Sequence, residues 1–166
     1  MRIYKFFDTD LSGIEEYDIS GEHYLTLLTT CFKYCSTVAV IISPDCTADI
    51  ELWEKYRIPL TDNVRKAYCH YGHISNEAPQ KIGNYEIRHY QLNQYLNNMI
   101  LSHTDSLFKW LCGWGYNNPN DLTFFRADGS IFFSSIVHEG VCTLFPNEYE
   151  DITDILNHGH WILMSH

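Results

Sequence analysis

Histidines and acids in the last third of the chain are the residue types best suited to metal chemistry. His138-Glu139 lies between two apolar runs, and His158 and His160 are separated by one residue. Imidazole and carboxylate groups bind zinc, so these side chains form a catalytic metal site if the fold brings them together. The helical metalloprotease motif H-E-x-x-H is absent, because Cys142 stands where its second histidine belongs. The four residues define an alternative hypothesis, a small metal-dependent hydrolase.

A second candidate is the segment Asp8-x-Asp10-x-Ser12-Gly13, which imitates the first half of a calcium-binding loop. The twelfth position of that loop is Ile19, which has no carboxylate, so the segment predicts a turn rich in Asx residues. The sequence also contains no G-x-S-x-G nucleophile motif and no glycine-rich phosphate-binding motif. We therefore assign no catalytic residue and expect no cofactor.

The distribution of charge points to the class of partner. The net charge is −10, with −4 in residues 1–32, zero in residues 33–126 and −6 in residues 127–166. Nucleic-acid binding needs a basic surface, so we expect no nucleic-acid partner. An acidic surface attracts a basic protein, and exposed aromatic side chains would supply buried contacts with it. The candidate binding residues are Glu148, Glu150, Asp151, Asp154, Trp114, Tyr116 and Tyr149.

The block that begins at Leu107 and continues through the second apolar run resembles the C-terminal block of small uncharacterised bacterial proteins. They share the pattern P-x-D-L-x-F-F-x-x-D-G followed by H-E. In this chain the pattern falls on Pro119, Asp121, Leu122, Phe124, Phe125, Asp128, Gly129, His138 and Glu139. The chain is also similar in composition to the immunity proteins of bacterial toxin systems, which are small, acidic and rich in aromatic residues. This resemblance implies a non-enzymatic, toxin-neutralising protein whose basic partner is a toxin domain.

The elements that must position these residues are predicted from periodicity. Two β-rich runs flank Asp128-Gly129, a strong hairpin signal, and a third run covers Val141–Phe145. The strand–helix–strand order of Arg2–Phe7, Gly21–Cys35 and Thr37–Ile42 would allow a parallel pair. We expect a single α+β domain over residues 1–166. It should contain a mixed or antiparallel sheet with a C-terminal β-meander and helices packed mainly on one face.

Helices are expected at several places between these strands. The first should bury Leu25, Leu28, Phe32 and Cys35, which recur at helical spacing. Others are expected over Thr47–Tyr56, Thr61–Tyr71, Asn93–Ser102, Asp105–Cys112 and Glu148–Asn157, with a further strand at Tyr85–Leu92. There is no apolar run long enough to span a bilayer and no signal peptide, so we expect a cytoplasmic protein with no membrane partner and with free cysteine thiols.

Overall fold

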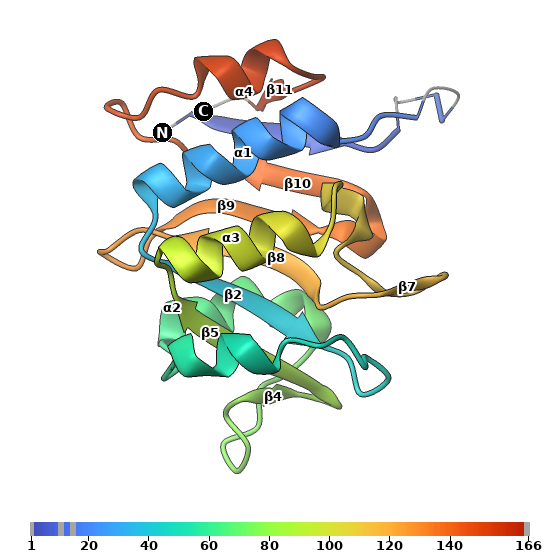
Figure 1. The fold of residues 1–166 in the computed structure, drawn as a ribbon, viewed down its shortest axis with the longest axis vertical. Helices are drawn as coiled ribbons and strands as arrows, with labels where there is room; N and C mark the ends of the chain where they lie inside the picture. The colour runs from blue at the N-terminus through green and yellow to red at the C-terminus, as the bar shows by residue number, and fades with distance from the viewer. Residues whose placement is uncertain (1, 10–11, 14–15, 165–166) are drawn as a thin grey trace.

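One antiparallel sheet organises the molecule. The computed structural model describes residues 2–9, 12–13 and 16–164. Its nine-stranded sheet has eight strands in a continuous order, and β4 (Lys81–Ile82) pairs with β5 beside them (Figure 1). The continuous order is β11 (Ile162–Met164), β1 (Ile3–Phe7), β10 (Val141–Leu144), β9 (Ile131–Ile136), β8 (Asn120–Phe125), β2 (Thr37–Ile42), β5 (Tyr85–Gln91) and β3 (Arg57–Ile58). The predicted α+β class and the C-terminal meander β8–β9–β10 are confirmed.

The parallel pair suggested by the early strand–helix–strand order does not form. Strand β1 pairs with β10 and β11, whereas β2 pairs with β5 and β8. The meander occupies the space between β1 and β2. The physical reason is that the meander strands pair with both of them, so no parallel contact is left to make.

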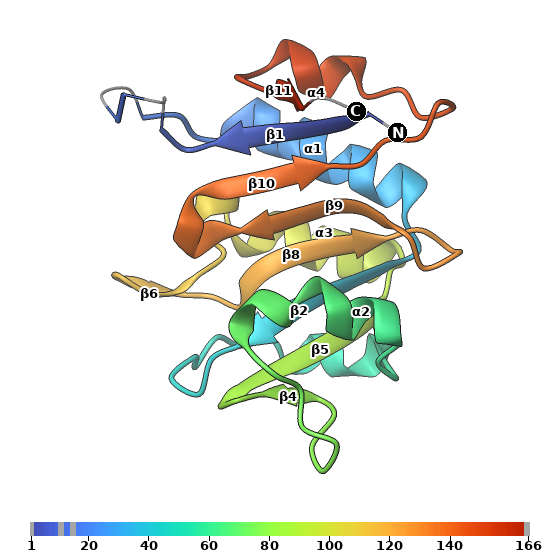
Figure 2. The ribbon, with the colours of Figure 1, turned by 180° about the vertical axis from the view of Figure 1, so that it is seen from behind.

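Two long helices cover one face of the sheet. Figure 1 shows α1 (Gly21–Tyr34) and α3 (Gln94–His103) lying across it. The short α2 (Asp62–Ala67) lies on the opposite face over β2 and β5, and in Figure 2 no helix covers β1, β10 and β9 on that side. The last helix, α4 (Thr153–Asn157), lies beside α1. The prediction that helices pack mainly on one face agrees with this arrangement.

The buried face of α1 is rotated from the predicted one. Leu28 is buried as expected, but Leu25 is half-exposed, and Cys35 lies just beyond the end of the helix. The inward side chains include His23 and Tyr24, and the Tyr24 hydroxyl accepts a hydrogen bond from the buried Trp110 indole at 2.8 Å. The prediction placed the buried face from the spacing of apolar residues, and it missed this face because the rings of His23 and Tyr24, which carry polar atoms, form part of it.

Two hydrophobic clusters share the sheet. The larger lies between the sheet and the α1/α3 layer and contains Phe6, Trp53, Trp110 and Phe124 among others. The smaller lies under α2 and includes Tyr68, whose hydroxyl donates to the Ala39 carbonyl at 2.7 Å. Where no helix covers the sheet, Lys5, Thr143 and Ser134 face away from α1 and form a polar row in register, and the row ends at Thr123, which is fully buried. This half-solvated arrangement is typical of antiparallel sheets.

Several predicted helices are shorter than expected. Only short 3-10 helices form within Thr47–Tyr56 and Asp105–Cys112, namely η1 (Glu51–Tyr56) and η3 (Leu107–Lys109). Thr61–Tyr71 divides into α2 and η2 (Cys69–Tyr71), and only the end of Glu148–Asn157 is helical, as α4. The strand expected at Tyr85–Leu92 and the helix at Asn93–Ser102 appear as β5 and α3.

All six cysteines are free, with Cys31 and Cys142 buried and Cys69 exposed. Burial raises the pKa of the Cys31 and Cys142 thiols well above the usual value, which keeps them uncharged inside the core. Within the described residues, the helices all lack the length and hydropathy needed to span a bilayer.

Candidate binding surface

A small hairpin projects from one end of the sheet and presents two aromatic side chains. Strands β6 (Cys112–Gly113) and β7 (Tyr116–Asn117) pair with Gly113 opposite Tyr116, so Trp114 and Gly115 form a two-residue turn. Both turn residues have positive φ, as a type I′ turn requires. A tryptophan rarely adopts this conformation, yet here it does so with 82% of its surface exposed. The hairpin therefore combines an unusual backbone conformation with a largely exposed aromatic ring.

The base of this hairpin is fixed to the body of the protein. The Asn117 side chain donates to the Thr47 hydroxyl at 2.6 Å and accepts from the Thr47 backbone N–H at 2.8 Å. Asn118 donates to the Lys109 carbonyl at 2.6 Å. These bonds hold the base, so the tip containing Trp114 projects in a defined direction (Figures 1 and 2). A pre-positioned aromatic side chain loses less entropy when a partner covers it.

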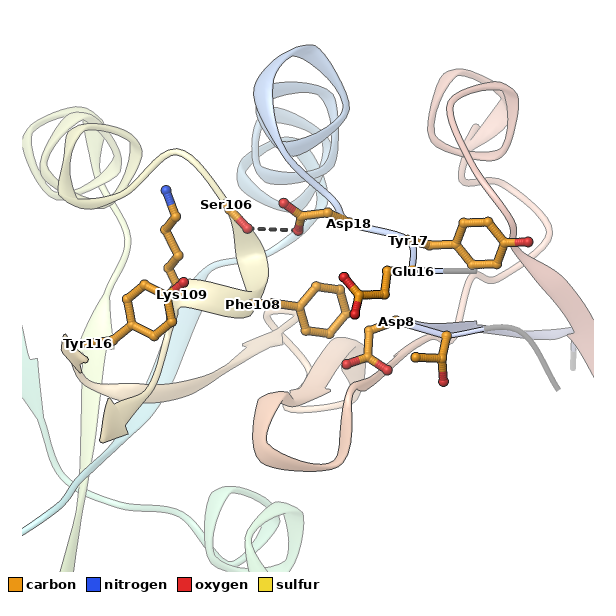
Figure 3. A pocket seen from close by; sticks show the side chains of 9 residues that line it. Asp8, Glu16, Tyr17, Asp18, Ser106, Phe108, Lys109 and Tyr116 are labelled. Carbon is orange, nitrogen blue, oxygen red and sulfur yellow. Dashed lines mark hydrogen bonds between the residues drawn. The ribbon is translucent and has the colours of Figure 1, made fainter. Parts of the chain in front are cut away.

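An acidic cavity of about 300 Å³ lies on one side of the hairpin, with Tyr116 in its wall. Figure 3 shows the carboxylates of Asp8, Glu16 and Asp18 grouped around the ring of Phe108. Two arms of the chain carry them, since Thr9 and Glu16 form a β-bridge, and the Ser106 hydroxyl fixes Asp18 with a 2.7 Å bond. This grouping concentrates negative charge beside the exposed aromatic rings.

Charge compensation within the acidic cavity is small. Lys109 also lines it, but its ammonium group pairs with Asp105 at 2.5 Å and points away from the three carboxylates in Figure 3. Burial, reinforced by the neighbouring Glu16 carboxylate, raises the pKa of Asp8 above its usual value. The cavity therefore holds negative charges close enough to repel one another, an arrangement that favours a cationic group.

The position of Asp8 depends on a glycine at the end of the H-E-G turn. Gly140 has a left-handed backbone with φ of 64°, and a Cβ there would collide with the Asp8 carboxylate. The backbone N–H of Asp8 also donates to the Gly140 carbonyl at 2.7 Å. This close approach places Gly140, which follows His138-Glu139, against the Asp8 side chain in the wall of the acidic cavity.

A second cavity, of about 440 Å³, lies on the other side of the hairpin and is called here the aromatic cavity. Its lining includes Trp114 and Cys112 from the hairpin, His138 from the 3-10 helix η4 (Val137–Glu139), and Tyr71 and Tyr85 from the segment around α2 and β5. The rings of Tyr71 and Tyr85 are 5.1 Å apart, and those of Tyr71 and His138 are 5.6 Å apart. The hairpin thus borders two cavities of different chemistry.

A fully buried carboxylate lies behind the wall of the aromatic cavity. Asp121 has no exposed surface and a positive φ of 53°, which is unusual for a non-glycine residue. Its carboxylate accepts hydrogen bonds from the Tyr71 hydroxyl and the Val137 backbone N–H, both at 2.6 Å. Burial and this carboxylate raise the pKa of Tyr71, so the phenol keeps its proton and remains the donor.

The binding residues predicted from sequence fall into two groups. Trp114 and Tyr116 lie on the hairpin, which precedes β8 at the sheet end where β10 begins. The other five follow β10, at the opposite end, where Tyr149 is 86% exposed (Figure 1). These five are Glu148, Tyr149, Glu150, Asp151 and Asp154. The structure therefore does not join the seven residues into one patch.

Glu150 does not belong to the exposed acidic surface. It is buried, and both of its oxygens accept hydrogen bonds from the Arg126 guanidinium at 2.6 Å. Hydrogen bonds from Arg126 and from the Asn147 backbone outweigh the effect of burial, and they lower the pKa of Glu150. Its carboxylate holds the fold together, whereas Glu148, Asp151 and Asp154 are exposed.

The residues of the metal hypothesis lie in different surroundings. His138 contacts His70 and Tyr71, whereas His158 stacks on His23 and His160 stacks on Tyr17. Glu139 is exposed beside His138. Across residues 2–9, 12–13 and 16–164, no group of three or more His, Cys, Asp or Glu side chains is placed to hold a metal ion. Asp10 of the calcium-like segment lies outside the described residues.

Sequence reasoning missed both cavities. Asp8 was considered as part of a calcium-like turn, and Glu16 and Asp18 only as part of an acidic N-terminal segment. Their convergence depends on the pairing of Thr9 with Glu16. His70, Tyr71 and Tyr85 carried no motif, because the contacts that unite them join segments distant in the chain. No protein-family model matches the chain, and neither does any curated protein or solved structure.

Proposed function

We propose that this chain is a non-enzymatic protein-binding domain that captures a basic protein, most concretely an immunity protein that neutralises a toxin domain. One observation carries the proposal: a rigidly based hairpin exposes Trp114 and Tyr116 directly beside the acidic cavity. Tryptophan and tyrosine are enriched among the residues that dominate binding energy at protein interfaces. Acidic groups next to them select a basic partner.

The mechanism is steric and electrostatic. The net charge of −10 attracts a basic partner over a distance of about 8–10 Å at physiological salt, and the exposed acids Glu148, Asp151 and Asp154 contribute to that field. Contact then buries the Trp114 ring, and the carboxylates of Asp8, Glu16 and Asp18 meet basic groups on the partner. A toxin whose substrate is anionic would carry such basic groups at its active site, so covering them would inhibit it.

Substitution of Trp114 by alanine tests this proposal. The tagged wild-type protein should retain a basic protein from its native lysate at low salt, and about 0.5 M salt should release it. The Trp114→Ala variant should retain at least tenfold less, because truncating a central aromatic residue costs about 2 kcal/mol or more. Tyr149→Ala is the matched control, since Tyr149 is equally exposed but lies at the other end of the sheet. It should retain as much partner as the wild type.

A second measurement separates an immunity protein from other binding proteins. The captured partner should arrest growth when expressed alone, and co-expression of the wild-type chain, but not of Trp114→Ala, should restore growth. Equal retention by both variants, or capture of an acidic partner, would show that the hairpin surface is not the binding site for a basic protein. A partner that binds through Trp114 without arresting growth would contradict the immunity assignment and leave a binding domain of another kind.

A further inference from the structure

The aromatic cavity has the wall chemistry of a site for an organic cation. Tyr71, Tyr85 and Trp114 line it, and the Tyr71 and Tyr85 rings meet at an interplanar angle of 57°. Rings at such angles present both faces and edges to the space between them. The negative face of an aromatic ring attracts a cation, and tryptophan and tyrosine attract it most strongly.

The charge behind the wall of the aromatic cavity is negative, as a cation-binding site requires. The Asp121 carboxylate is wholly buried, lies 3.8 Å from the His70 Nε2 atom and is bonded to the Tyr71 hydroxyl. Among the ion pairs of the described residues, His70 is the partner of Asp121, and no lysine or arginine shares it. Buried carboxylates are normally balanced by a full positive charge, and this one is balanced by a histidine and two neutral donors.

We propose that the aromatic cavity binds a guanidinium group, supplied by an arginine side chain of the basic partner. Guanidinium is favoured because it is planar, stacks on aromatic rings and is more weakly hydrated than an ammonium group. A phosphate or carboxylate would be repelled by Asp121. The identity of the donor rests on the proposed function, but the chemistry of the cavity does not, because it follows from Asp121 and the rings alone.

A small probe tests the cavity without any partner. N-acetyl-arginine amide should bind the isotopically labelled chain with a dissociation constant on the order of 1 mM and should shift the Trp114 indole resonance. N-acetyl-citrulline amide has almost the same shape without the charge, and it should bind at least tenfold more weakly. Equal binding of both probes, or no saturable shift at roughly 20 mM arginine probe, would overturn the proposal.

Two variants locate the site. Asp121→Asn removes the charge with little change in shape, and asparagine is among the residues that accept a left-handed backbone. It should weaken the arginine probe about tenfold, because the buried carboxylate attracts the cation from behind the wall at low effective dielectric constant. Trp114→Ala, at an exposed position, should weaken binding of the arginine probe about two- to fivefold. If Asp121→Asn does not fold, this second variant shows whether the probe binds in the aromatic cavity. The control Glu22→Gln removes an exposed charge on α1, which covers the other face of the sheet, and should leave binding unchanged.

The outcomes distinguish this inference from the proposed function. A probe that binds in the absence of any retained protein partner supports the cavity and contradicts the proposed function. A basic partner that binds through Trp114, together with an arginine probe that does not bind, supports the function and overturns the cavity. If Asp121→Asn binds the probe as tightly as the wild type, the carboxylate is not the recognition element and the proposal fails.

Discussion

His23 shows how a single titratable residue links the core to pH. It projects from α1 into the core, is 7% exposed, and accepts a hydrogen bond from the Trp161 indole on its Nε2 atom at 3.2 Å. Burial, with a contribution from the nearby His158 charge, lowers the pKa of His23 to about 4. Protonation would both charge the core and remove the acceptor for Trp161.

Stability should therefore fall as the pH drops below about 6.5. The unfolded chain takes up the proton at the ordinary histidine pKa, whereas the folded chain resists it until about pH 4. The contribution of neutral His23 to the free energy of unfolding is fully present above pH 6.5 and is lost as the pH falls from 6.5 to about 4. We expect a loss of roughly 2 kcal/mol between pH 7 and pH 5, measured by urea unfolding.

The variant His23→Gln provides the control for this pH dependence. Glutamine keeps an acceptor for Trp161 but does not titrate, so its stability should change less between pH 7 and pH 5. A smaller slope should remain, because burial also lowers the pKa of His89 and His103. An identical slope in the variant and the wild type would show that His23 is not the group responsible.

At the scale of single residues, the sequence predicted which side chains are exposed better than it predicted which groups they contact. Trp114 and Tyr116 were expected to be exposed contacts and are exposed, because both lie on the small β6–β7 hairpin outside the main sheet. Glu150 was expected to act with its acidic neighbours, but Arg126 binds it from 24 residues away. No local pattern marks such a pair, and the same holds for Asp121 and Tyr71, which are 50 residues apart.

At the scale of elements, one arginine joins three segments. Arg126 follows β8 and donates to the carbonyls of Ile131 and Phe145 and to the carboxylate of Glu150. It thus connects the β8–β9 hairpin to the loop that precedes α4. Both partners of the ion pair are largely buried, with side-chain exposures of 13% and 6%. The segment from Phe145 to Glu150 has no regular secondary structure of its own, so this contact determines its position.

Removing the Glu150 charge should destabilise the protein without affecting its acidic surface. We expect Glu150→Gln to lower the free energy of unfolding by roughly 3 kcal/mol, because it leaves the Arg126 charge buried without its partner. The control Glu148→Gln, at an exposed neighbouring position, should change it by less than about 0.5 kcal/mol. Equal urea midpoints for the two variants would contradict a structural role for Glu150.

Elements were predictable where their periodicity was local and long. The strands of the meander, β2, β5 and α3 lie close to their expected positions, since each has a clear apolar pattern or cap. The prediction of a helix over Asp105–Cys112 was wrong because of contacts with residues later in the chain. The backbone N–H of Cys112, which would donate to the Phe108 carbonyl in such a helix, donates to the Asn120 side chain, and Cys112 pairs with Asn117 in the hairpin. The hairpin β6–β7 was missed as strands because each strand is only two residues long.

At the scale of the whole molecule, the edge of the sheet at β1 is covered by the chain end. Strand β11 pairs with β1, and the preceding Trp161 packs on Phe6 with ring centroids 5.5 Å apart. Side chains of β11 are exposed, so its contribution lies in backbone pairing and in holding Trp161. An uncovered edge strand is a template for pairing with another molecule.

Ending the chain at His160 should therefore both destabilise and oligomerise the protein. Loss of the Trp161 ring should lower the free energy of unfolding by about 3 kcal/mol, and the open β1 edge should produce concentration-dependent association in sedimentation experiments. Leu163→Ala preserves the backbone pairing of β11 and should remain in the wild-type oligomeric state. Association of both variants alike would assign the effect to side chains and not to the edge.

The strand order itself could not be read from the sequence. Hairpin turns specify only neighbours in the chain, such as β8 with β9 and β9 with β10. The pairings of β1 with β10 and of β2 with β8 join residues 79 or more positions apart, and they depend on how all the apolar faces are buried together. The acidic cavity could not be predicted for the same reason. Asp8, Glu16 and Asp18 come from the N-terminal segment, whereas Ser106, Phe108 and Tyr116 come from a segment distant in the chain.

The position of β1 also determines when the chain completes its fold during synthesis. Among the described strands, β1 pairs with β10 and β11, which follow it by 134 residues or more, so its backbone groups remain unpaired until those strands have been synthesised. At about 5–20 residues per second, that interval lasts roughly 7–30 seconds. During it, the apolar side chains of Ile3–Phe7 lack these neighbours, so we expect the nascent chain to bind chaperones, and the long separation of β1 from its partners gives the fold a high contact order.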